Sequence, residues 1–235
     1  MVKKVNFSRH MEVLWLNQTA LWAAEGLTKP EINRKINQML SSQINCKVNL
    51  GKTRNQLTSI WLDSGDSVDQ EFTNTAINLV SKYEELPLAL HLGLLIAKKK
   101  FFADILRFIG RHSKLNDSFT YAQAQKKTVE LYGDTETVKR SLRSALKTMV
   151  ELDLIQRSSN RSYVVNKHKH MVPNELKNWL LTAVLYSEKA TSRTLNDMLD
   201  DAVWFPLNYH VAPSEIDKNL FEIHHQGNDE MLFLK

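Results

Sequence analysis

The chain has 235 residues and a net charge of +5, and its 43% hydrophobic and 24% charged residues are typical of a folded globular protein, which excludes a disordered or fibrous chain. Lysine and arginine outnumber aspartate and glutamate by 13 to 9 in residues 1–100 and by 13 to 7 in residues 101–170, whereas residues 171–235 hold 5 against 10. The basic middle favours a polyanionic partner, and the acidic C-terminal part favours a protein partner or the basic part of the same chain.

Two further features limit where the protein works. Cys46 is the only cysteine, which excludes an internal disulfide and favours a reducing compartment. The most apolar window, residues 86–97, has 12 residues and is too short to span a bilayer, so it is expected to be a buried helix. We therefore expect a cytoplasmic protein without a membrane partner.

Apolar residues at helical spacing predict a mainly α fold that begins with a helical bundle over residues 1–100. Thr28 is a favourable N-cap, and Glu31 lies three residues after it, as in a capping box. The helices are expected at residues 11–25, 28–40, 52–62, 67–83 and 88–100. Three tryptophans fall in their apolar stripes and are expected in the core and not against a ligand: Trp15, Trp22 and Trp61.

Residues 101–170 have the order of three helices followed by a hairpin, which predicts a winged helix-turn-helix domain. The first helix is expected at residues 101–112, where four apolar residues share one face: Phe102, Ile105, Leu106 and Ile109. Residues 116–119 are expected to form a polar turn. The second helix, at residues 121–131, ends before Gly133.

The third helix, expected at residues 135–150, is the most informative about function. Its apolar stripe consists of Val138, Leu142, Ala145, Leu146, Met149 and Val150. Four basic side chains fall outside that stripe: Lys139, Arg140, Arg143 and Lys147. A helix that inserts into a major groove needs this division, with apolar anchoring behind and donors to phosphates or base edges in front.

A hairpin is expected at residues 154–165, because a polar turn with Arg157 and Arg161 separates two short apolar runs. In a winged helix this hairpin is the wing, here residues 157–161, and its arginines contact phosphates or a minor groove.

These patterns predict a non-enzymatic protein that binds duplex DNA through the third helix and the wing. The expected binding residues are Lys139, Arg140, Arg143, Lys147, Arg157 and Arg161. Side chains of the third helix that suit base edges are few, with Ser141, Ser144 and Thr148 at most. We therefore expect weak sequence preference and steep salt dependence.

Residues 171–235, in which acidic side chains outnumber basic ones, are predicted to form a small α+β domain. Helices are expected at residues 173–187, 192–199 and 213–220, and strands at residues 203–209, 221–225 and 230–234. Pro206 favours an edge position for the first of these strands. The order of elements is again that of a winged helix, so a second winged-helix-like domain is one interpretation, and a simple α+β cap on the middle domain is the other.

Several catalytic and cofactor motifs are absent from the sequence. Gly51-Lys52-Thr53 resembles the end of a phosphate-binding loop, but Cys46 stands where that motif needs a glycine. Two pairs of histidines have no carboxylate or thiolate at metal-ligand spacing: His168 with His170, and His224 with His225. Because no nucleophile, base and orienting group come together, we expect no enzymatic activity, no metal and no cofactor.

Several segments also occur in an order that indicates a family. They are Ala-Glu-Gly-Leu at 24–27, Thr-Lys-Pro-Glu at 28–31, residues 92–106, residues 142–155 and the pair Phe205-Pro206 before the C-terminal hairpin. By their order and spacing the chain resembles the BrxA family, a small component of the BREX phage-exclusion systems of bacteria. The resemblance covers most of the chain and includes no catalytic motif. It implies a cytosolic antiviral defence protein that works beside a DNA methyltransferase, a large ATPase and a phosphatase-like subunit.

Two other functions fit the same residues. In the first, the protein is an adaptor whose acidic C-terminal part docks another subunit of the defence complex. In the second, it is an RNA binder that uses its N-terminal helices. The expected partners are therefore duplex DNA, with RNA as the alternative polyanion, and defence-system subunits such as a methyltransferase or an ATPase.

Overall fold

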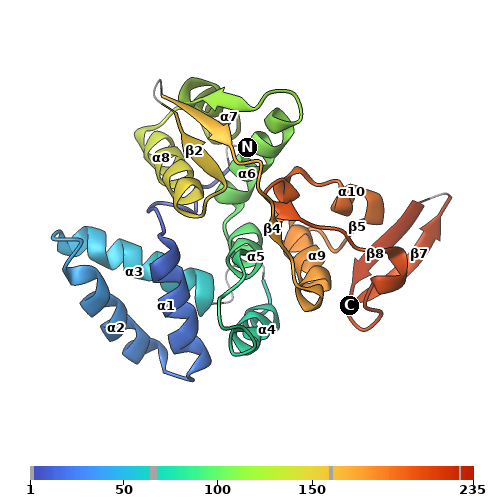
Figure 1. Cartoon of the computed structure of the whole chain (residues 1–235), viewed down its shortest axis with the longest axis horizontal. Helices are drawn as coiled ribbons and strands as arrows, with labels where there is room; N and C mark the ends of the chain where they lie inside the picture. The colour runs from blue at the N-terminus through green and yellow to red at the C-terminus, as the bar shows by residue number, and fades with distance from the viewer. Residues whose placement is uncertain (1–2, 64–67, 159–160, 228) are drawn as a thin grey trace.

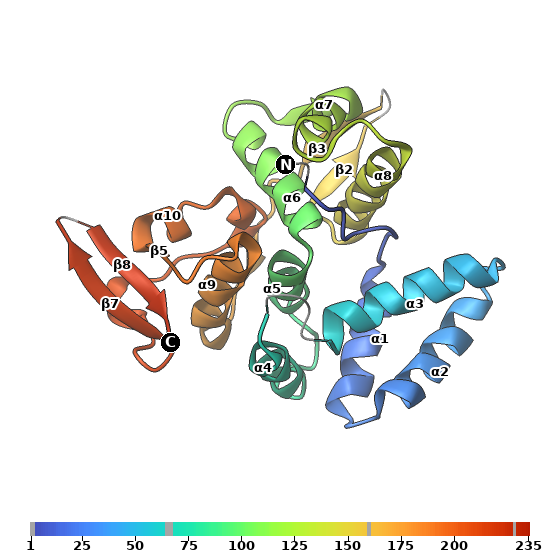
Figure 2. The same ribbon diagram turned by 180° about the vertical axis from the view of Figure 1, so that it is seen from behind.

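The computed structural model describes residues 3–63, 68–158, 161–227 and 229–235 of the chain. Over these residues the protein is mainly helical, with ten α-helices and three small β-sheets. Figures 1 and 2 show the helices of residues 13–61 on one side, the helices of residues 100–151 with a small sheet at the top, and the C-terminal elements on the other side, grouped around the helix of residues 88–98. The prediction of a mainly helical fold with a small sheet portion is therefore confirmed.

Five helices form the N-terminal part: α1 (Val13–Ala24), α2 (Lys29–Ser41), α3 (Lys47–Trp61), α4 (Gln70–Val80) and α5 (Leu88–Lys98). Helix α2 begins as predicted, because the Glu31 carboxylate accepts the Thr28 backbone N–H at 2.8 Å. Helix α3 begins at Lys47, before its predicted start at Lys52. Ser67, the predicted start of the fourth helix, lies outside the described residues.

Helix α5 lies within the large hydrophobic core, with every residue from Ala89 to Lys98 buried. It packs against the C-terminal helix α9 (Asn174–Glu188). Gly93 permits this close approach, because a Cβ atom there would lie 2.1 Å from the Trp179 ring. Helix α5 therefore couples the N-terminal helices to the C-terminal part.

A break separates α5 from α6 (Lys100–Ser113). The single helix predicted over residues 88–100 is wrong at its end, because Lys99 has φ −120° and ψ 73°, outside the helical region. The Lys98 ammonium group donates to the carbonyls of Ile60 at 2.8 Å and Asp63 at 2.6 Å. These bonds hold the break against the end of α3.

Of the three tryptophans expected in the core, Trp15 and Trp61 are buried and Trp22 is partly buried. The Lys35 ammonium group lies 5.5 Å from the centroid of the Trp22 ring. A helical stripe shows which side of a helix is apolar, but it does not show how far the neighbouring layer extends over that side.

After α6, the middle of the chain continues with β1 (Ser118–Thr120), α7 (Tyr121–Tyr132), α8 (Glu136–Glu151), β2 (Ile155–Arg157) and β3 (Ser162–Val165). The strands form an antiparallel sheet of order β1-β3-β2. The helices and the hairpin strands agree with prediction, but the polar turn predicted at residues 116–119 is wrong in part. Phe119 is buried and stacks on Tyr163 at 5.3 Å between ring centroids, which holds β1 against β3. Residues 159 and 160 of the predicted wing lie outside the described residues.

The C-terminal part surrounds α9 and ends in a hairpin. Its other elements include β4 (His170–Met171), β5 (Ser192–Thr194), α10 (Leu195–Leu199), β6 (Leu207–Asn208), β7 (Phe221–Gln226) and β8 (Asp229–Leu234). Strands β4 and β6 pair in parallel, and β5, β8 and β7 form an antiparallel sheet in that order. The predicted hairpin is confirmed, and the helix predicted at residues 192–199 is helical only from Leu195.

Two other predicted elements of this part differ from the structure. The strand predicted at residues 203–209 is present only as β6, and the segment begins instead as a 3₁₀ helix, η1 (Ala202–Trp204), because the Asp201 carboxylate accepts the Val203 N–H at 3.1 Å. The helix predicted at residues 213–220 is a single 3₁₀ turn, η2 (Pro213–Glu215). The Asn178 side chain accepts the Asp217 N–H at 2.9 Å, which removes a donor that a continuing helix would need.

Candidate nucleic-acid interface

Helix α8 separates an apolar face from a charged one, as its sequence predicted. Gly133, with φ 83°, ends the preceding helix, and the Thr135 hydroxyl caps α8 by accepting the Val138 N–H at 3.3 Å. The buried stripe contains Val138, Leu142, Ala145, Leu146 and Met149. The opposite face is exposed and carries Glu136, Arg140, Arg143, Lys147 and Glu151. We call Arg140, Arg143 and Lys147 the basic strip.

The two arginines of the basic strip are exposed and only loosely paired. Their side chains are 73% and 58% exposed for Arg140 and Arg143, and the Glu136 carboxylate lies 3.9 Å from Arg140 Nε and 3.7 Å from Arg143 Nη2. Exposed pairs of this kind contribute about 0–1 kcal/mol, so a phosphate can replace Glu136 at small cost.

Lys139 lies apart from the strip. Its side chain is 27% exposed, and its ammonium group lies 2.7 Å from the Asp134 carboxylate. The hydrogen bond to Asp134 raises the pKa of Lys139, which keeps the lysine charged and paired. Of the four basic residues that the sequence predicts on this helix, three therefore share the outer face.

Lys147 contacts a histidine from the start of the chain. Its Nζ lies 2.9 Å from His10 Nε2, and the Glu12 carboxylate lies 3.4 Å from the same nitrogen. Burial and the charge of Lys147 lower the pKa of His10 below its ordinary value. A neutral imidazole at neutral pH accepts a hydrogen bond from the ammonium group, which orients Lys147 without neutralising it.

An N-terminal segment, residues 5–11, covers one flank of α8. Figure 2 shows this dark blue segment passing between α8 and α3 before α1 begins. The Thr148 hydroxyl accepts the Met11 N–H at 2.8 Å, and Ser144 donates to the Ser8 carbonyl at 3.4 Å. Ser141 is also buried, so of the three side chains that suit base edges Ser144 alone keeps partial exposure.

The same segment is held from its other side by α3 and α6. The Gln56 amide oxygen accepts the N–H groups of Ser8 at 2.8 Å and Arg9 at 3.1 Å. The Asn6 side chain accepts the Phe101 N–H at 3.1 Å, and Phe7 is fully buried. Sequence analysis missed this segment, because a short extended stretch without periodicity carries no local signal of where it packs.

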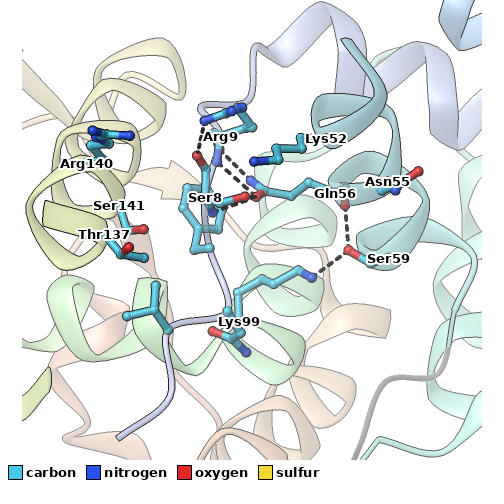
Figure 3. A pocket seen from close by; sticks show the side chains of 13 residues that line it. Ser8, Arg9, Lys52, Asn55, Gln56, Ser59, Lys99, Thr137, Arg140 and Ser141 are labelled. Atoms are coloured by element: carbon cyan, nitrogen blue, oxygen red, sulfur yellow. Dashed lines mark hydrogen bonds between the residues drawn. The ribbon is translucent and has the colours of Figure 1, made fainter. Parts of the chain in front are cut away.

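A hollow of about 440 Å³ lies between α3, the N-terminal segment and the first turns of α8. Figure 3 shows four cationic side chains around it, from four different stretches of the chain: Arg9, Lys52, Lys99 and Arg140. Among the described residues that line this basic hollow, none carries a carboxylate. Arg140 belongs both to the basic strip and to the hollow, so the two form one continuous cationic surface.

The predicted wing arginines are also exposed. Arg157 ends β2 opposite Tyr163, and Arg161 lies just before β3 with φ 55°. The Arg161 carbonyl accepts the Tyr121 N–H at 3.1 Å, which ties this end of the hairpin to the start of α7.

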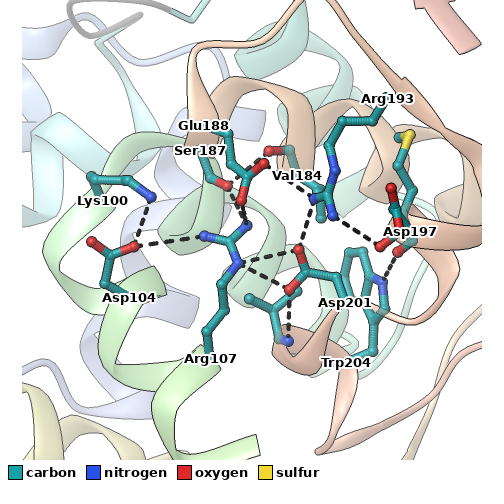
Figure 4. A network of polar contacts seen from close by, with 12 residues as sticks. Lys100, Asp104, Arg107, Val184, Ser187, Glu188, Arg193, Asp197, Asp201 and Trp204 are labelled. Carbon is teal, nitrogen blue, oxygen red and sulfur yellow. Dashed lines mark hydrogen bonds and ion pairs between the residues drawn. The ribbon is translucent and has the colours of Figure 1, made fainter. Parts of the chain in front are cut away.

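Two acidic residues of the C-terminal part form ion pairs with arginines that lie outside α8. Arg107 of α6 contacts Asp201 at 2.9 Å and Glu188 at 3.5 Å. Figure 4 shows Arg107 lying between these two carboxylates. Arg193 contacts the same two carboxylates at 2.9 and 3.3 Å. Over the described residues, no ion pair joins residues 171–235 to α8. The acidic part therefore leaves the basic strip accessible.

Comparison of the chain with family models, with curated proteins and with solved structures finds no match. Among the described helices, none combines the length and apolar character that crossing a membrane requires.

Proposed function

We propose that this protein is a non-enzymatic DNA-binding protein and that residues 101–170 act as a winged helix-turn-helix. The order helix, strand, helix, helix, hairpin and the sheet order β1-β3-β2 support this interpretation. Helix α8 is then the recognition helix, and the hairpin β2-β3 with Arg157 and Arg161 is the wing.

The observation that carries the proposal is the exposed basic strip. Arg140, Arg143 and Lys147 follow one another at helical spacing on one face of α8, and the acidic C-terminal residues do not cover them. Cations in such a column match a phosphate backbone, and each neutralised phosphate adds about 0.9 to the salt slope of duplex binding.

The weak preference for DNA sequence follows from the scarcity of accessible uncharged donors beside the basic strip. Thr148 is buried under the N-terminal segment and Ser141 is also buried, so few uncharged donors remain to contact base edges. Phosphate contacts therefore supply most of the affinity, and binding falls steeply as salt rises.

The resemblance to the BrxA family supplies the proposed setting, a cytoplasmic component of a BREX phage-exclusion system. The acidic C-terminal part then serves contact with another subunit, such as a methyltransferase or an ATPase. A second recognition helix is not proposed there, because the residues expected to form it are the single turn η2, Pro213–Glu215.

The test is a charge reversal, Arg140→Glu with Arg143→Glu, in the full chain. Binding to random-sequence duplex should weaken by at least about tenfold, and the salt slope should fall by about two. Arg34→Glu in α2 with Lys218→Glu in the turn before β7 changes the net charge equally at exposed sites away from α8 and should leave binding within about twofold.

Equal affinities for the two double variants would remove the basic strip as the interface. Competition with structured RNA at fixed salt adds a second comparison. Displacement by RNA at lower concentration than by duplex DNA would favour the RNA-binding alternative, in which the N-terminal helices contact the RNA.

A further inference from the structure

The described residues that line the basic hollow include several cations and no carboxylate. Arg9 donates to the Ser8 carbonyl at 3.1 Å and to the Asn49 side chain at 2.8 Å, which are both uncharged acceptors. Lys99 donates to the Ser59 hydroxyl at 2.6 Å. The Lys52 ammonium group has no hydrogen-bond or ion-pair partner among the described residues. The hollow therefore concentrates positive charge at a concave surface, which focuses the field on an anion.

A buried donor at the hollow also lacks an acceptor. The Nε–H of Arg9 is buried and has no hydrogen-bond partner among the described residues. Buried polar groups are nearly always paired, so this N–H leaves the Arg9 guanidinium group incompletely compensated beside a concave basic site, which favours an anion there. Thr137 and Arg140 bring the first turns of α8 to the same place, and the N-terminal end of a helix attracts anions.

The hollow is built from fixed parts. Gln56 binds the backbone of Ser8 and Arg9, and the Thr148 hydroxyl binds Met11, so the segment that carries Arg9 is held between α3 and α8. Cations that are already in place lose little conformational freedom on binding. A volume of about 440 Å³ has room for a phosphate group and part of its sugar.

We infer that the basic hollow binds one phosphate group of a nucleic-acid strand, with Arg9, Lys52 and Arg140 as its charged partners. Helix α3 then contacts the same nucleic-acid strand as α8, and the N-terminal helices belong to the nucleic-acid interface. This inference rests on the proposed nucleic-acid function. The phosphate is either an internal phosphodiester or a terminal 5′-phosphate, since both present the same anionic oxygens.

The experiment compares Lys52→Glu with Lys47→Glu in the full chain. Both lysines are exposed on α3 and undergo the same charge change, but Lys47 does not line the hollow. Each variant is titrated with three duplexes of one sequence: one closed by hairpins at both ends, one with 5′-phosphates and one with 5′-hydroxyls.

Lys52→Glu should weaken binding about tenfold and lower the salt slope by about one, whereas Lys47→Glu should change affinity less than about twofold. If Lys52→Glu also loses affinity for the hairpin-closed duplex, the hollow binds an internal phosphodiester. If it loses affinity for the 5′-phosphorylated duplex alone, the hollow binds a terminal phosphate. Lys52→Met should give a smaller loss in the same direction, because it removes a charge without adding the opposite one.

Indistinguishable affinities of Lys52→Glu and Lys47→Glu for all three duplexes would overturn the inference. If Arg140→Glu with Arg143→Glu still weakened binding in that case, the proposed function would stand without the hollow. If neither Lys52→Glu nor the double variant weakened binding, both proposals would fall.

Discussion

The basic strip on α8 and the cluster around Arg107 are both rich in charge, yet their surroundings differ. The Arg143 side chain is 58% exposed and its carboxylate neighbour is 3.7 Å away, whereas the Arg107 side chain is 5% exposed and bonds Asp201 at 2.9 Å. Water screens the first pair and not the second. The comparison teaches that charges at α8 remain available to a ligand, while those around Arg107 attach the C-terminal part to α6.

The pKa of Asp201 shows how strongly the Arg107 cluster is coupled. Burial alone raises the pKa of this carboxyl, but the Arg107 charge and hydrogen bonds from Arg107 and Arg193 outweigh it, so the pKa lies below its ordinary value. A buried carboxylate that stays ionised in this way stabilises the contact between α6 and the C-terminal part.

The largest difference between the two regions should appear when each loses an arginine. Arg107→Met leaves Asp201 buried without its main partner and should lower the free energy of unfolding by about 3–5 kcal/mol. Arg143→Met should change it by no more than about 0.5 kcal/mol. Denaturant titration of both variants measures this, and similar losses would show that the comparison is wrong.

A second prediction concerns the packing that holds the C-terminal part against α5. Gly93→Ala places a methyl group 2.1 Å from the Trp179 ring and should cost about 3 kcal/mol of stability. Gly51→Ala is the matched control in α3, where nothing lies within 4 Å, and it should stabilise by about 0.5–1 kcal/mol. Thermal unfolding of the two variants shows whether each substitution raises or lowers the stability of the protein.

The pH dependence of stability should single out the Arg107 cluster. Because the folded-state pKa of Asp201 lies below its ordinary value of 3.8, its contribution is complete above that pH and is lost as the pH falls through the lowered pKa. Asp201→Asn should therefore cost about 2 kcal/mol at pH 7 and less at pH 3. A cost that does not change between these pH values would contradict the assignment of an ionised Asp201.

The smallest expected effect separates two residues of the same helix. Arg143→Ala should weaken duplex binding severalfold, whereas Lys139→Ala should change it less than about twofold, because Lys139 is paired with Asp134 away from the outer face. Gel-shift titrations at one salt concentration measure both. A larger loss for Lys139 would place the interface on the other flank of α8.

How far an element or a site could be predicted from the sequence depends on whether the residues that determine it are neighbours in a regular pattern. Arg140, Arg143 and Lys147 face outward because an apolar stripe with a period of 3.6 residues must turn them away from the core, and this holds for any packing of α8. The strand predicted at residues 203–209 forms only at Leu207–Asn208, for the opposite reason. There the Asp201 side chain bonds a nearby backbone N–H and selects a 3₁₀ turn that apolar alternation does not reveal.

By itself the sequence determined the mainly helical fold, the capping of α2 at Thr28 and Glu31, and the outward direction of the basic strip, because each depends on residues within a few positions of one another. Only the tertiary structure decided that an N-terminal segment buries Thr148 and brings Arg9 and Lys52 beside Arg140. Those contacts join stretches far apart in the chain, and they depend on the packing of α3, α6 and α8 around one core and not on any local pattern.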